Sequence, residues 1–234
     1  MKDSVWGEKA TAKKNGNEGV VVSGNNLFFY TGVTKPNILQ FNKHLLDLDA
    51  KHISESTRLG IDPPPIRVRI NSGGGSVTAG LAGMDVMKSC QSPIETRVEG
   101  FCASAATFIS VSGSERLMTE SSFILIHQLS SSFWGRYDEF VDEKKNLDLM
   151  MESIRTIYRA RTSIPARELD RLLKRDLLLD SAKCCDWGLV DRIVGSSIDA
   201  EMSLSSDSSS VSRPEGRAGS KQQIDRESES MMDF

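Results

Sequence analysis

The chain has 234 residues, a formal net charge of −3 at pH 7 and a hydrophobic fraction of 38%, enough for an ordinary packed core. Its basic residues are scattered, which excludes a nucleic-acid surface because phosphate binding needs a concentrated cationic face. No apolar run approaches the roughly 20 residues needed to cross a bilayer, and the opening MKDSVWGEKATAKKNGNEG contains no hydrophobic signal segment. We therefore expect a cytoplasmic protein that binds neither nucleic acid nor membrane.

The four cysteines show no spacing suitable for a metal site. They are Cys90, Cys102, Cys184 and Cys185, and the two adjacent ones could hardly serve one tetrahedral zinc ion. The prediction is reduced, mostly buried thiols and no metal.

Composition divides the chain into three parts. Residues 1–18 are polar and rich in Lys, Asn and Gly, which predicts a flexible leader. Residues 196–234 are rich in Ser and almost free of aromatic and β-branched side chains, which predicts a disordered tail. Residues 19–195 remain as a single folded domain.

Short β-rich runs alternate in this domain with stretches of helical period, the pattern of an α/β layered fold. Three helices are predicted from apolar stripes at steps of three and four, around Ile38–Leu48, Val77–Met87 and Leu147–Tyr158. Two shorter helices are predicted after Pro165 and over Ser181–Trp187. The predicted strands are Val20–Val22, Leu27–Tyr30, Ile66–Ile70, Ile94–Val98, Arg116–Met118, Phe123–Ile126 and Leu189–Val194.

Three segments carry candidate chemistry. INSGGGS at residues 70–76 is a glycine run between a predicted strand and a predicted helix, where bare N–H groups can approach an oxyanion or a phosphate. Ser104, in GFCASAATFI, follows a predicted strand among small residues, so its hydroxyl can project from the turn as a nucleophile or cap the next helix. His127 ends the apolar strand FILIH and is a candidate general base. Each signal alone is weak.

Together these segments resemble a known family. INSGGGSVTAG, GFCASAATFI, ILIHQ and KRDLLLDSAKCCDWGLVDRI occur in the order and approximate spacing of the Clp protease proteolytic subunit, and LFFYTG is similar to its first core strand. The resemblance covers about residues 26–195. It implies the layered α/β fold shared with crotonases, with βαβ units and an extended handle helix.

The resemblance also implies a site and a mechanism. Ser104 is the expected nucleophile, His127 its base and Asp176 the orienting carboxylate, with oxyanion donors at Gly74 and Ala105. The implied reaction is hydrolysis of unfolded polypeptides through an acyl-enzyme, without metal or organic cofactor. Asp180 lies close enough in sequence that the residues themselves do not choose between it and Asp176.

The family further implies a homo-oligomeric, heptameric ring and an ATP-driven AAA+ unfoldase as a partner. Three features depart from its pattern: Gly73 replaces a proline, LSSS at residues 129–132 replaces Pro-Leu-Gly-Gly, and the leader shows no match to the axial loop. The alternatives are a phage capsid-maturation protease of the same fold, a catalytically idle ring subunit and a crotonase-type acyl-CoA enzyme.

Overall fold

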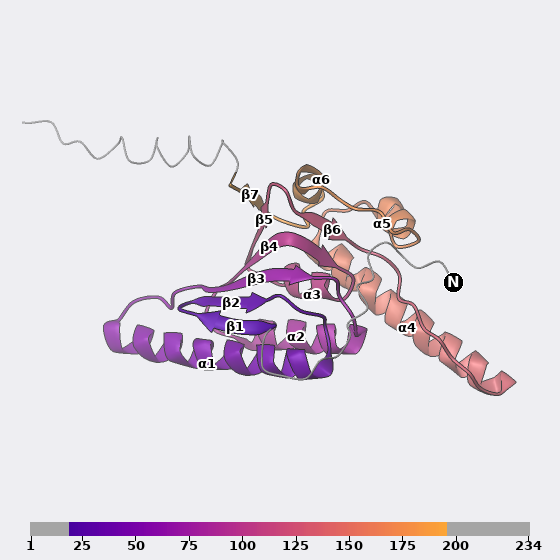
Figure 1. Ribbon diagram of the computed structural model, residues 1–234, viewed down its shortest axis with the longest axis horizontal. Helices are drawn as coiled ribbons and strands as arrows, with labels where there is room; N and C mark the ends of the chain where they lie inside the picture. The colour runs from indigo at the N-terminus through magenta and orange to yellow at the C-terminus, as the bar shows by residue number, and fades with distance from the viewer. Residues whose placement is uncertain (1–18, 196–234) are drawn as a thin grey trace, which may run out of the picture. The chain divides into compact units, whose positions relative to one another are not determined.

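The computed structural model describes residues 19–195, in which one mixed sheet of seven strands is combined with six helices (Figure 1). The sheet order is β1-β2-β3-β4-β5-β7, and β6 pairs with the far end of β4. All pairs are parallel except β1 with β2 at the edge. The strands are β1 Val20–Ser23, β2 Asn26–Phe29, β3 Ile66–Ser72, β4 Ile94–Ala103, β5 Glu115–Thr119, β6 Phe123–Leu125 and β7 Arg192–Val194.

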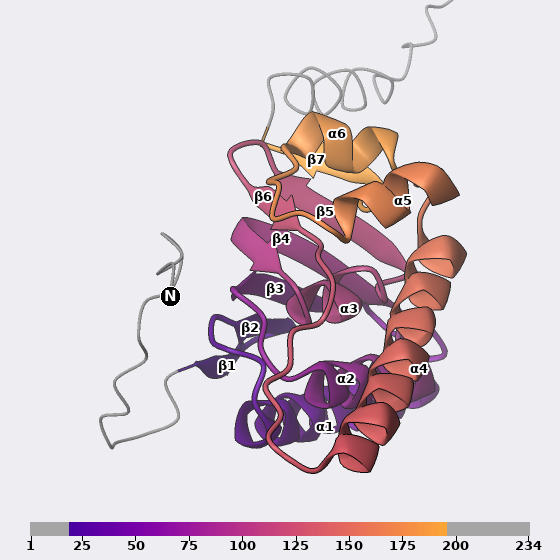
Figure 2. The same ribbon diagram turned by 90° about the vertical axis from the view of Figure 1, so that its right-hand side faces the viewer.

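The two faces of the sheet differ in polarity. Along β3 the side chains of Ile66, Val68 and Ile70 are fully buried, whereas the alternating Arg67 and Arg69 point to the other face. The buried face is covered by α1, α2 and α3 (Figure 2), so the hydrophobic core lies between the sheet and these helices. Of the described elements, none covers the opposite face of β2–β5.

Local signals set the limits of the helices. The side chain of Thr34 accepts from the N–H of Asn37 at the start of α1, and Gly60, with φ 67°, ends it in the left-handed conformation. Ser76 caps α2 in the same way through the N–H of Ala79. The helices are α1 Lys35–Leu59, α2 Val77–Ser89, α3 Ala106–Ser110, α4 Tyr137–Arg161, α5 Ala166–Leu172 and α6 Ser181–Asp186.

Helix α4 extends away from the body of the molecule (Figure 1). Its C-terminal part is anchored, because Ile154 and Tyr158 are buried and the Tyr158 hydroxyl lies 2.6 Å from Oγ1 of Thr107 on α3. Its first turns and the segment before them expose large side chains, with Trp134 98% and Tyr137 81% exposed. This matches the predicted handle helix.

The predicted α/β layered fold is confirmed, with differences at element ends. Strand β4 continues to Ala103 because its last residues pair with β6. Strand β7 starts only at Arg192 because the N–H groups of Leu189 and Val190 both donate to the carbonyl of Cys184 in α6 and not to a neighbouring strand. The predicted leader and tail lie outside the described residues. No helix within residues 19–195 has the length and apolarity to span a membrane.

Candidate active site

Ser104 lies on a sharp turn between β4 and α3. Its φ is 54°, the one positive value among the described non-glycine residues, and this strained backbone is held by a hydrogen bond from its N–H to the carbonyl of Leu125 at 2.9 Å. The cap position of α3 is occupied by Ala105, without a side-chain hydrogen bond. The alternative that Ser104 serves as a helix cap is therefore wrong, and its hydroxyl projects from the turn.

Gly74 lies directly against this turn. It has φ 88°, and a Cβ there would lie 2.5 Å from the carbonyl oxygen of Ala103 and 2.7 Å from Cβ of Ser104. Only glycine fits such a close approach. The N–H of Gly74 donates to Oγ of Ser72 at 3.2 Å, so it is not directed freely at the space beside Ser104.

His127 reaches the site from β6. This strand runs parallel to the end of β4, with Ala103 beside Leu125, so a residue shortly after β6 lies near the turn that follows β4. The Nδ1 of His127 lies 2.7 Å from Oδ1 of Asp176. That contact leaves Nε2 as the ring nitrogen available to another group.

Asp176 is placed by a second chain segment that follows α5. The N–H of Gln128 donates to the carbonyl of Leu173 at 2.7 Å, and Ile124 and Leu179 exchange both of their backbone hydrogen bonds. Residues 173–179 thus run antiparallel to residues 124–128, which brings Asp176 beside His127. Asp180 has a different role, because its side chain accepts from the N–H of Lys183 at the start of α6.

Ser104, His127 and Asp176 line one cavity of about 210 Å³, together with Gly73, Phe101, Ala103 and Leu125. Most of the other lining groups are apolar, so the cavity suits an uncharged side chain of a substrate. Within the described residues the hydroxyl of Ser104 and the ring of His127 are not hydrogen-bonded to each other; such contacts often close only when substrate binds. No cluster of side chains suited to a metal ion occurs within residues 19–195.

The cysteines are free, as predicted, but only Cys102 and Cys184 are buried; the other two are partly exposed. Burial raises the pKa of the Cys184 thiol to about 12 and that of Cys90 to about 11. These thiols are therefore protonated at neutral pH, and neither is an activated nucleophile.

Comparison with known proteins identifies the family. A family model described as Clp protease matches residues 26–197. An ATP-dependent Clp protease proteolytic subunit from Ostreococcus tauri is 32% identical over 169 residues, covering 71% of this chain and 80% of that protein. One of the same description from Oltmannsiellopsis viridis is 34% identical over 131 residues, covering 55% and 67%.

The fold has a solved counterpart in a ClpP1 mutant from Listeria monocytogenes, with a TM-score of 0.63 and 23% sequence identity, covering 74% of this chain and 93% of that one. The chain belongs to the Clp protease family and is a serine peptidase of the proteolytic-subunit type. The predicted family and peptidase class are thereby confirmed, and the crotonase alternative is disfavoured.

Proposed function

We propose that Ser104, His127 and Asp176 form the catalytic triad of this peptidase. Ser104 Oγ attacks the scissile carbonyl carbon while Nε2 of His127 takes its proton, which passes to the leaving amine as the peptide bond breaks. Water then attacks the acyl-enzyme, His127 takes a proton from that water and returns it to Ser104, and the acid product leaves. Asp176 holds the tautomer and stabilises the imidazolium.

The observation that carries this proposal is the contact between Nδ1 of His127 and Asp176 at 2.7 Å, in the cavity that Ser104 lines. A histidine held in this way presents its other nitrogen to a nucleophile. The hydroxyl of Ser104, carried on a left-handed turn, lines the same cavity and is the candidate nucleophile for this base.

The oxyanion donors follow from the backbone. The N–H of Ala105 begins α3 next to the nucleophile and has no acceptor in the described part of the chain. Gly74 was predicted as the second donor, but its N–H is engaged with Ser72, and its carbonyl accepts from Val33 at 2.8 Å. Because N–H and C=O of one trans peptide point in opposite directions, the N–H of Gly75 points away from Val33. We assign the second donor to Gly75.

The chain's substrates are proposed to be unfolded polypeptides, cleaved inside a heptameric homo-oligomeric ring. The handle supports assembly, because it exposes large side chains such as Trp134 and Tyr137, and clustered exposed apolar surface marks protein contacts. The relatives' description as ATP-dependent supports an AAA+ unfoldase as the partner that delivers substrate. We place this system in the cytoplasm.

The test is labelling by a fluorophosphonate probe together with hydrolysis of a fluorogenic peptide. The wild-type chain should react at Ser104 and cleave the peptide, and Ser104→Ala should do neither while keeping its circular dichroism spectrum. The expected loss of rate is several orders of magnitude, as for other triad nucleophiles. Undiminished hydrolysis by Ser104→Ala would refute the triad.

A further inference from the structure

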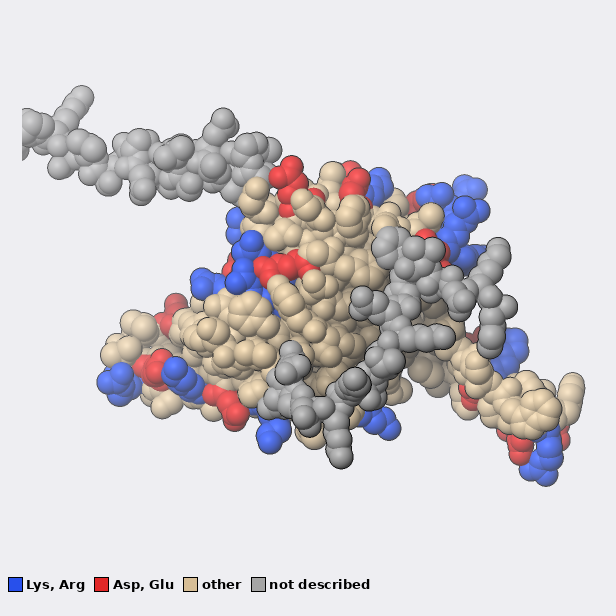
Figure 3. All heavy atoms as spheres, in the orientation of Figure 1, with Lys and Arg blue, Asp and Glu red and all other residues tan. Residues whose placement is uncertain are grey.

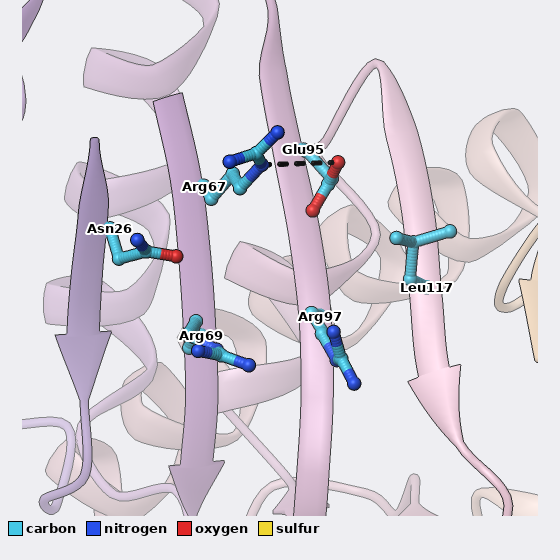
Figure 4. Close-up of a pocket in the computed structure, with 6 residues that line it drawn as sticks. All are labelled: Asn26, Arg67, Arg69, Glu95, Arg97 and Leu117. Atoms are coloured by element: carbon cyan, nitrogen blue, oxygen red, sulfur yellow. Dashed lines mark ion pairs between the residues drawn. The ribbon is translucent and has the colours of Figure 1, made fainter. Parts of the chain in front are cut away.

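Polar groups are arranged differently on the two sides of the sheet. On the open face they form rows across neighbouring strands (Figure 4), with Asn26, Arg67 and Glu95 in one row and Arg69 beside Arg97 in the next. Charged side chains also lie at the surface of the face that Figure 3 shows. On the helix-covered side polar groups are buried in the core, where each one is costly unless its hydrogen bonds are made.

Two buried hydroxyl groups on the covered side form a chain that ends at the nucleophile turn. Thr107 of α3 is 0% exposed and Tyr158 of α4 is 1% exposed. Oγ1 of Thr107 donates to the carbonyl oxygen of Ser104 at 2.5 Å, and the N–H of Thr107 donates to the same oxygen at 3.0 Å. Because that bond uses the one hydroxyl proton of Thr107, the Tyr158 hydroxyl, 2.6 Å from Oγ1, is the donor to it.

The state and the place of the Tyr158 side chain suit this donor role. Burial raises the pKa of Tyr158, so its hydroxyl keeps the proton at neutral pH. The ring packs against that of Phe108, with 6.1 Å between the centroids. Packing therefore holds the ring in place independently of the hydroxyl, which makes the hydroxyl a group that can be removed by itself.

The chain of hydroxyl groups fixes a whole peptide unit of the site. The carbonyl of Ser104 and the N–H of Ala105 belong to one planar trans peptide, so they point in opposite directions. With the carbonyl held in the core by Thr107, the N–H of Ala105 points out of the core, and it is the oxyanion donor next to the nucleophile. Ser104 has a strained φ of 54°, and a rotated peptide would present a carbonyl oxygen to the oxyanion in place of a donor.

We propose that Thr107 and Tyr158 are positioning residues for acyl transfer, which hold the Ser104–Ala105 peptide so that its N–H meets the oxyanion of the transition state. The inference rests on the proposed function, because it needs Ser104 as the nucleophile. Both side chains are buried away from substrate, so their effect on the reaction passes through this peptide.

The experiment measures kcat and KM on a fluorogenic peptide. Tyr158→Phe should lower kcat about tenfold, and Thr107→Val should lower it about 10²-fold, as loss of an oxyanion donor does. KM should change less than about twofold, because the oxyanion exists only in the transition state and the tetrahedral intermediate. Thr107→Ser keeps the hydroxyl and should recover most of the rate. Thr107→Val with Tyr158→Phe should be no slower than Thr107→Val alone, because Tyr158 acts through Thr107.

A peptide aldehyde inhibitor separates positioning from a general loss of structure, since its hemiacetal with Ser104 presents an oxyanion to the same donors. Its inhibition constant should rise in each variant by the factor by which kcat/KM falls. The matched control is Thr96→Val, which removes a buried bond of the same kind, from Oγ1 of Thr96 to the carbonyl of Ser110 at 2.7 Å. Its kcat per active site, counted with the fluorophosphonate probe, should stay within about twofold of wild type.

Three results would overturn the proposal and leave the triad intact. They are wild-type kcat in Tyr158→Phe and Thr107→Val, an equal loss in Thr96→Val, and an inhibition constant that does not follow kcat/KM. If Thr107→Val does not fold, Tyr158→Phe and its inhibition constant decide. Hydrolysis by Ser104→Ala would refute the triad itself, so the two failures are told apart.

Discussion

Asp176 and Asp180 have different roles because they lie on different parts of the chain: Asp176 contacts His127, whereas Asp180 caps α6. Asp176→Asn should lower kcat by roughly 10⁴-fold, because an amide does not hold the required tautomer of His127 or stabilise its imidazolium. Asp180→Asn is the matched control: asparagine caps a helix as well as aspartate does, so kcat should stay within about twofold. Peptide hydrolysis by both purified variants gives the answer. The reverse pattern would move the triad carboxylate to Asp180.

The close approach of Gly74 to the Ser104 turn leaves no room for a larger side chain. Gly74→Ala should lower kcat by about 10²-fold or more, because the new methyl group displaces the Ser104 turn, and a shift of about 1 Å in a reacting group has that effect. Gly32→Ala is the control, since its Cβ would meet only the carbonyl of Gly74 at an ordinary 3.7 Å. Active-site titration with the fluorophosphonate probe separates slow chemistry from unfolding. Equal rates for the two variants would show that the close approach is unimportant.

The residues of the site were predictable from sequence only as a set. Taken singly, Ser104 and His127 could each have been explained as a structural residue. The catalytic interpretation was favoured because several motifs agree in their order along the chain. The choice of Asp176 depended on the resemblance, because the antiparallel pairing of residues 173–179 with 124–128 is a tertiary contact without a local signal. The hydrogen bond from the N–H of Gly74 to Ser72 could not be predicted from the sequence either, since it depends on the path of one backbone turn.

At the scale of elements, Asp49 connects α1 to the loop before β4. Its carboxylate accepts from the N–H of Ser92 at 2.7 Å and of Gln91 at 3.2 Å. Burial by itself raises the pKa of Asp49, but these hydrogen bonds lower it below the ordinary value. The ionised carboxylate therefore stabilises the folded state above the unfolded pKa of about 3.9, and this contribution is lost as the pH falls through the lowered folded pKa.

Asp49→Asn should lower the free energy of unfolding by about 1.5–3 kcal/mol at pH 7, because a charged acceptor of two N–H groups is replaced by a neutral one. The difference from wild type should shrink as the pH falls below about 4. Urea unfolding at both pH values measures it, and Asp47→Asn on the exposed side of α1 is the control. A difference that does not change with pH would assign the effect to packing.

The elements themselves were largely predictable because their periodicity is strong, as in α1, where Phe41, Leu45 and Leu48 are all buried. The ends of the elements were harder to predict. Leu189 and Val190 have the composition of a strand, yet they pack into the core before β7 begins. The polar rows of the open face were not predicted either, since alternation along one strand does not say which strands will be neighbours.

For the whole molecule we expect a native mass of seven or more chains. We also expect the enzyme to cleave peptides and casein but to leave a stable folded protein intact. A scissile bond must come within about 3 Å of the nucleophile and the oxyanion donors, which an enclosed site permits only for an extended chain. Native mass spectrometry and degradation assays with and without an AAA+ unfoldase and ATP are the measurements. Rapid degradation of a folded protein by the enzyme alone would rule out a closed chamber.

The handle has a thermodynamic consequence for the isolated subunit. Trp134, Tyr137 and Phe140 lie on a part of the chain that extends from the body and has little of its own core beneath it. If these side chains are covered only by other subunits, association and folding share one free energy, and dilution weakens both. The urea midpoint would then rise with protein concentration, so that the cell's supply of subunits, as much as their sequence, would set how long each one survives.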